Sequence, residues 1–224
     1  MAGFAWGRSS IGKKALMALS GLILFGFIVG HLLGNLLIFR GPEALNAYAL
    51  KLRKLGPGLW MVRIALFLAL LVHVWTSERV TRENLRARPQ PYRAYRPEAT
   101  TLAARTMMLS GIALMVFLIY HLLHFTVRVT NPEVAHLTDA AGHHDVYRMV
   151  VLSFQRWPIV VAYLIGVGAV CLHLSHGIGS SVQTLGLNTP QTIGWTAWAG
   201  RLAAWAIFLG YASIPVAVLC GVVR

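Results

Sequence analysis

Four histidines stand one in each of four hydrophobic segments of a 224-residue chain, at His31, His73, His121 and His173. Ionisable residues are rare inside a membrane and mark function where they occur there. Imidazole is a common ligand of haem iron and of other transition metals. Four imidazoles on four successive segments therefore point to two pairs of metal or haem ligands.

The composition places these histidines in a membrane protein. Hydrophobic residues make up 57% of the chain and charged residues only 12%. A soluble domain of this length has no interior large enough for so much apolar surface, so lipid must cover it. The formal net charge of +13 comes from basic residues between the apolar segments. We expect them to face lipid headgroups and acidic partner surfaces, and not nucleic acid.

Five segments are long and apolar enough to cross a bilayer core of about 30 Å, which takes about 20 helical residues. The sequence therefore predicts an all-α integral membrane protein, with a single membrane domain (1–224) of five transmembrane helices that form a haem-binding bundle. An odd number of spans places the two termini on opposite sides. The predicted spans are 15–39, 59–77, 106–127, 157–183 and 202–223.

Basic residues favour a cytoplasmic N-terminus by a small margin. The segment 79–105 holds seven arginines, and Lys13 and Lys14 lie on the same side. The loop 41–57 is also basic but would lie on the other side, where it is expected to form a short interfacial helix. The loop 128–156 contains His136, His143 and His144, yet no ligand spacing typical of a metal site, so a solvated polar loop is expected.

The depths of the four histidines divide them into pairs. His31 lies eight residues before Phe39, about 12 Å at 1.5 Å per residue, and His121 lies at a similar depth, seven residues before Arg128. His73 and His173 lie nearer the inner side. The sequence therefore predicts a pair His31/His121 and a pair His73/His173, at two levels about 10–15 Å apart.

Ligation of two b-type haems by paired histidines fits this pattern. An iron porphyrin needs two opposed imidazoles and a slot of small residues beside its faces. The chain has no Cys-x-x-Cys-His motif for covalent attachment, and its spans have no carboxylates for a proton relay. The glycines that provide such slots, or else close helix packing, are Gly30, Gly34, Gly111, Gly166, Gly168 and Gly177.

Spacing alone leaves two ligands open, because His124 follows His121 by three residues and His176 follows His173 by three. Depth favours His121 over His124 and does not separate His173 from His176. By charge and position, Arg148 and Lys14 are candidates to pair with haem propionates.

Several sequence motifs occur together along residues 9–186. They are Ser10-Ile-Gly-Lys-Lys-Ala-Leu-Met-Ala-Leu-Ser-Gly, His31-Leu-Leu-Gly-Asn, His73, Ala87-Arg-Pro-Gln-Pro-Tyr, Tyr120-His121 and His173-Leu-Ser-His-Gly. In combination they resemble the cytochrome b membrane subunit of bacterial succinate dehydrogenase and fumarate reductase, of the five-helix, di-haem, single-subunit anchor type. The last span resembles that of the family only in type.

The resemblance implies two haem b groups and a choice of ligands. The fourth-helix ligand of the family opens a His-x-Ser-x-Gly pattern, which is His173 here, and the third-helix ligand matches His121. It also implies that His31 and His121 hold the haem far from the catalytic subunits. His73 and His173 then hold the near haem.

The function implied is that of the anchor and electron-transfer subunit of a succinate:quinone oxidoreductase, respiratory complex II, which belongs to the tricarboxylic acid cycle. Its partners would be a flavoprotein subunit with FAD and an iron–sulfur subunit, in a bacterial inner membrane. The basic inner surface of Lys13, Lys14 and the 79–105 loop would dock the iron–sulfur subunit. Its substrate would be menaquinone or ubiquinone, and a higher oligomer of the complex is compatible with it. The chain has no dinucleotide fingerprint and no cysteine cluster, so it carries no dicarboxylate chemistry itself.

One residue departs from part of that family, and two other function classes stay open. Some di-haem quinol:fumarate reductases have a glutamate, associated with proton transfer across the membrane, two residues before the fourth-helix ligand. This chain has Cys171 at that position. This difference argues against a transmembrane proton path of that kind.

The alternatives are a haem b subunit of a hydrogenase or formate dehydrogenase, and a haem-free membrane anchor or transporter.

Overall fold

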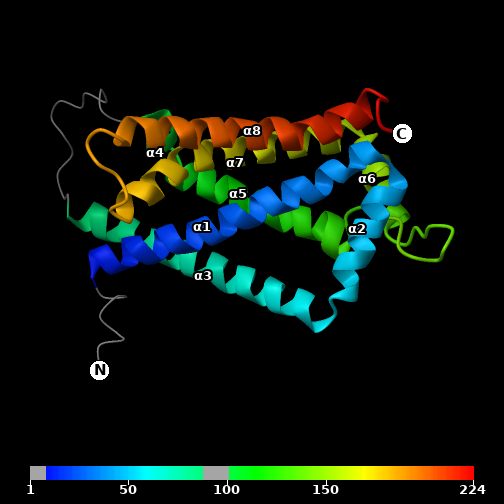
Figure 1. Ribbon diagram of the computed structural model, residues 1–224, viewed down its shortest axis with the longest axis horizontal. Helices are drawn as coiled ribbons and strands as arrows, with labels where there is room; N and C mark the ends of the chain where they lie inside the picture. Colours follow the sequence, from blue (N-terminus) through cyan, green and yellow to red (C-terminus); the bar gives the residue numbers. More distant parts are fainter. Residues whose placement is uncertain (1–8, 88–100) are drawn as a thin grey trace.

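The protein is an all-α bundle, as predicted (Figure 1). The computed structural model describes residues 9–87 and 101–224. In these residues five helical segments are long and apolar enough to cross a membrane. They are α1 (Ser10–Asn35) with the 3-10 turn η1 (Leu36–Arg40), α3 (Pro57–Arg86), α5 (Met107–His121) with the π-helical η3 (Leu122–Val127), α7 (Trp157–Thr184) and α8 (Ile193–Leu219).

Several of these helices extend beyond the apolar segments expected from the sequence. The first begins at Ser10 because the Ser9 hydroxyl accepts a hydrogen bond from the Gly12 amide at 3.0 Å and caps it. The second continues to Arg86, and the last begins at Ile193. Hydropathy marks the part of a helix that lipid covers, whereas its ends are set by capping and by glycine or proline.

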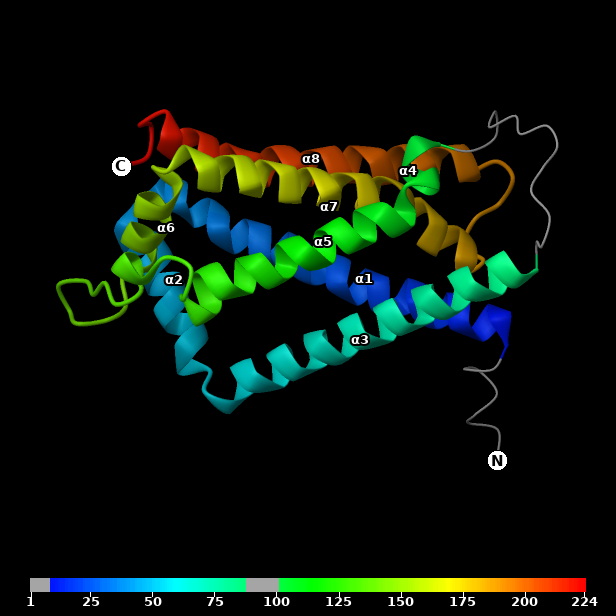
Figure 2. The same cartoon turned by 180° about the vertical axis from the view of Figure 1, so that it is seen from behind.

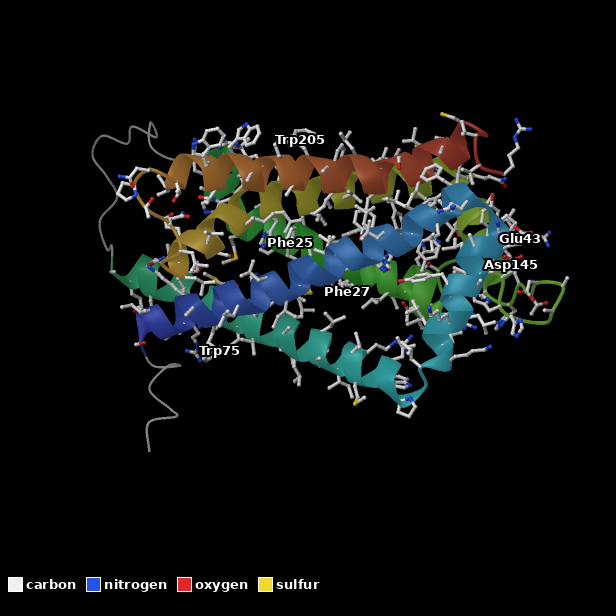
Figure 3. All side chains as sticks on the ribbon, viewed as in Figure 1. Phe25, Phe27, Glu43, Trp75, Asp145 and Trp205 are labelled. Atoms are coloured by element: carbon white, nitrogen blue, oxygen red, sulfur yellow. The ribbon has the colours of Figure 1, made fainter. Side chains whose placement is uncertain are left out.

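The long helices run along one axis, and the start of α1 and the C-terminus lie at opposite ends of the bundle (Figures 1 and 2). The pair α7 and α8 lies on one side, and α3 lies at the opposite edge in both views. Large apolar side chains point outward on both sides, among them Trp75 of α3 and Trp205 of α8 (Figure 3), which are 45% and 56% exposed. Such a surface is stable where lipid covers it.

A short helix α2 (Pro42–Lys54) crosses the end of the bundle where the C-terminus lies (Figure 1). Gly41 and Gly56 flank it with φ of 96° and 52°, a left-handed region that suits glycine. The helix expected in the loop 41–57 is therefore confirmed. It joins the helix α6 (Val146–Phe154) because Asn46 donates to Asp145 at 2.9 Å and accepts from the Tyr147 amide at 2.9 Å.

The segment between α5 and α7 also lies at this end and is more ordered than a solvated loop. Arg156 donates to Asn131 at 2.6 Å and to Glu133 at 2.7 Å, and Asn131 is 2% exposed. His136 and His143 are exposed, but the His144 side chain bonds to the Leu137 carbonyl. Burial lowers the pKa of His144, so it is neutral at pH 7 and its Nε2 can accept from Arg128 at 3.3 Å.

Candidate functional site

The structure brings the four histidines together in two pairs. His31 of α1 and His121 at the end of α5 have ring centroids 5.9 Å apart, with ring planes at 84°. His73 of α3 and His173 of α7 have ring centroids 6.1 Å apart, with ring planes at 68°. These are the pairs that depth along the spans predicted, here called the far pair and the near pair. Their role as iron ligands stays a prediction.

Both separations fit a metal ion held between two imidazoles. A metal–imidazole nitrogen bond is about 2.0–2.1 Å, and a ring nitrogen lies about 1.1 Å from its ring centroid, so the centroids of two opposed ligand rings are roughly 6 Å apart. The two measured separations, 5.9 and 6.1 Å, agree with that value. Haem therefore fits the spacing of both pairs.

Hydrogen bonds fix which nitrogen of the near pair is free. Nδ1 of His73 lies 3.1 Å from the Met17 carbonyl oxygen, which can only accept, so the proton of the neutral ring is on Nδ1. It also lies 3.4 Å from the Ser20 hydroxyl oxygen. Nδ1 of His173 lies 3.3 Å from the Ser110 hydroxyl, which donates its own proton to the Met107 carbonyl at 3.1 Å and can therefore accept from Nδ1. Occupied Nδ1 atoms leave both Nε2 atoms free as ligands, the usual support of a metal-bound histidine.

The far pair is held by aromatic side chains. His31 stacks on Phe27 with centroids 5.3 Å apart and planes at 16°, and Tyr211 lies 6.3 Å from it. Nδ1 of His121 lies 3.3 Å from the Tyr163 hydroxyl. Aromatic rings therefore surround this pair, and the Tyr163 hydroxyl is within hydrogen-bond distance of His121.

Two glycines let the near histidines lie against bare backbone. A Cβ atom at Gly21 would be 3.1 Å from Cε1 of His73, and one at Gly111 would be 3.5 Å from Cε1 of His173. Gly111 was among the expected slot residues, whereas Gly21 was not.

At Gly34 and Gly166 the structure favours close packing, the alternative that the sequence left open, over a slot. A Cβ atom at Gly34 would meet the ring of Tyr48 at 2.6 Å, and one at Gly166 would meet the ring of Phe117. Aromatic side chains already fill these places, so both glycines serve close packing. By contrast, a Cβ atom would meet nothing within 4 Å at the remaining expected glycines, Gly30, Gly168 and Gly177.

A short internal repeat underlies both pairs, and sequence reasoning missed it. Met17-Ala-Leu-Ser-Gly in α1 matches Met107-Met-Leu-Ser-Gly in α5, and each repeat ends ten residues before a histidine of the far pair. The serine and glycine of each repeat contact one histidine of the near pair. At the near pair, α1 supplies a serine and a glycine to the histidine of α3, and α5 supplies a serine and a glycine to the histidine of α7. At the far pair, α1 and α5 each supply a histidine.

The spacing between the two levels is the same on three helices. Ten residues separate Gly21 from His31 on α1, and ten separate Gly111 from His121 on α5. Tyr163, at the far pair, and His173 are also ten residues apart on α7. At 1.5 Å per residue each interval is about 15 Å along the helix. The two pairs are therefore separate sites at two depths.

The neighbouring histidines have other surroundings. His124 is 2% exposed, bonds to the Tyr163 hydroxyl at 2.9 Å and stacks on Phe125 with centroids 4.1 Å apart. His176 lines a cavity of about 140 Å³ together with Ser180 and Asn188. Because the rings of His121 and His173 are the ones that face another histidine, the geometry favours them as ligands.

The candidate propionate partners lie on the surface. Lys14 is exposed near the start of α1, and Arg148 is exposed on α6 at the other end of the molecule. Their pairing with propionates stays a prediction. Lys13, expected in a docking surface, is only 7% exposed and forms an ion pair with Glu83 of α3. Arg88, Arg93 and Arg96 of the arginine-rich segment, and most of the Ala87-Arg-Pro-Gln-Pro-Tyr motif, lie outside the described residues.

Comparisons of the chain with protein-family models, curated protein sequences and solved structures find no match. The family resemblance therefore rests on the motifs quoted above. The support for a function from the structure comes from the geometry of the two histidine pairs.

Proposed function

We propose that this chain is the membrane anchor and di-haem b electron-transfer subunit of a succinate:quinone oxidoreductase. The observation that supports it is the pair of sites with imidazole rings about 6 Å apart at two depths. Single histidines that only hydrogen-bond a neighbouring helix would have no reason to face one another at this spacing twice.

In this proposal His73 and His173 bind the near haem, and His31 and His121 bind the far haem. Haem supplies one-electron chemistry when it is bound. The two histidines of each pair would hold one haem iron, and Ser20, Ser110 and Tyr163 would orient the ligand rings.

The partners would be a flavoprotein subunit with FAD and an iron–sulfur subunit, docked at the end of the bundle where α1 begins and α3 ends. Lys14 and Arg86 are exposed there. The paired Lys13 and Glu83 would hold α1 and α3 together beneath the partner rather than attract it. Menaquinone or ubiquinone would be the membrane-soluble substrate, and we place the N-terminus on the cytoplasmic side of a bacterial cell membrane.

Gentle detergent extraction tests this proposal. A flavoprotein and an iron–sulfur protein should purify with the chain, and their retention should fall as salt concentration rises, because screening weakens charge pairs at an exposed surface. Succinate should reduce the haems of the intact complex and quinone should reoxidise them. Haem that stays oxidised with succinate but is reduced by hydrogen or formate would instead assign the chain to another respiratory enzyme.

A further inference from the structure

One tyrosine hydroxyl lies between two histidines at the far pair. Tyr163 is 6% exposed, and its hydroxyl oxygen lies 3.3 Å from Nδ1 of His121 and 2.9 Å from Nδ1 of His124. The Nε2 atom of His124 is buried and has no hydrogen-bond partner in the described structure. The three side chains therefore form a short chain of hydrogen bonds that ends in an unpaired nitrogen.

Counting protons shows in which direction these hydrogen bonds are donated. A tyrosine hydroxyl has one proton, and a neutral imidazole has one N–H group. If Nε2 of His121 binds iron, its proton must be on Nδ1, where it is donated to the Tyr163 oxygen. The Tyr163 proton is then donated to Nδ1 of His124, and the remaining N–H of His124 is on Nε2.

The opposite direction is incompatible with ligation. If Tyr163 donates to His121, the proton of His121 is on Nε2 and blocks the lone pair that iron needs. His124 gives the Tyr163 proton an acceptor on the other side, and so permits the direction in which His121 can bind. This direction leaves a buried N–H of His124 without an acceptor, which costs free energy. A residue kept in place at such a cost calls for a functional explanation.

The backbone brings both histidines to the same hydroxyl. The α-helix α5 ends at His121 and changes to the π-helical turn η3 (Leu122–Val127), which contains His124. Single π-helical turns inside α-helices occur frequently at functional sites. Here the turn lies beside a histidine of the far pair.

We infer that Tyr163 and His124 are positioning residues that hold His121 as an Nε2 ligand and lower the reduction potential of the far haem. This inference rests on the proposed function. A hydrogen bond donated from Nδ1 makes a metal-bound imidazole more basic, and a more basic ligand stabilises the oxidised iron. The near pair has serine hydroxyls and a backbone carbonyl in the corresponding places, so the two haems are tuned by different groups.

Redox titration of the two haems in the purified complex tests the inference. Tyr163→Phe removes the acceptor and should raise the midpoint potential of the far haem without moving that of the near haem. Tyr120→Phe is the matched control, because Tyr120 packs against Tyr163 and His124 but makes no hydrogen bond to a histidine in the described structure. It should leave both potentials unchanged. The far haem is identified as the one lost in His31→Ala.

A second variant decides the matter if Tyr163→Phe fails to assemble. His124→Leu leaves the Tyr163 proton without its acceptor, and should raise the far potential in the same direction by a smaller amount. Two bound haems with an unchanged or lowered far potential, in either variant, would overturn the inference while leaving the proposed function intact. Failure of the proposed function looks different, because the unaltered protein would then contain fewer than two haems, or haems that succinate does not reduce.

Discussion

His31→Ala and His121→Ala will each remove the same haem, and His73→Ala and His173→Ala will each remove the other. Every one of these variants should retain about half of the bound haem. The reason is that each pair of rings faces across one site, at 5.9 Å for the far pair and 6.1 Å for the near pair. Loss of one histidine would leave the iron of that site with a single imidazole ligand.

Redox titration and the absorption spectrum of each variant measure this effect, with haem content per chain as the quantity compared. His176→Ala is the matched control for His173→Ala, since it lies one turn along the same helix and lines a separate cavity. It should keep both haems. Loss of different haems by the two members of a pair would show that the pairing is wrong.

Gly21→Val will remove the near haem and keep the far one. A Cβ atom at this position would lie 3.1 Å from Cε1 and 3.3 Å from Nδ1 of His73, so the methyl groups of valine would need the space of the ring. The ring would have to turn, and it would lose its hydrogen bond to the Met17 carbonyl. A misplaced ligand nitrogen cannot complete the coordination of iron.

Gly26→Val is the control for this substitution. A Cβ atom at Gly26 meets nothing within 4 Å, and at 3.6 residues per turn it points about 140° away from both Gly21 and His31 around α1. We expect both haems to remain, as measured by haem content and the reduced spectrum. Two haems in Gly21→Val, with unchanged potentials, would contradict the placement of His73 against α1.

The five spans and the two histidine pairs could be predicted from the sequence because both depend on counting residues along helices. Hydropathy gives the length of a span, and the fixed rise of 1.5 Å per residue converts position into depth. The common level of His31 and His121 could therefore be predicted without knowledge of how the helices pack. The repeat Met-x-Leu-Ser-Gly, ten residues before each of them, was also legible in the sequence and would have pointed to Ser20 and Ser110.

The contacts between helices could not be predicted in this way. Whether Tyr163 reaches His121, or Phe117 fills the space beside Gly166, depends on how each helix is rotated about its own axis. The depth of a residue along its helix gives no information about that rotation. Lys13 was expected in a docking surface because it is basic, yet it is paired with Glu83, which is 70 residues away in the sequence.

The haem content of the purified chain tests the central claim most directly. A pyridine haemochrome assay should give two b haems per chain, and the spectrum should be that of low-spin iron with two imidazole ligands. This follows from two pairs of facing histidines at separate depths and from the absence of a Cys-x-x-Cys-His motif in the sequence. One haem per chain, or none, would contradict the account.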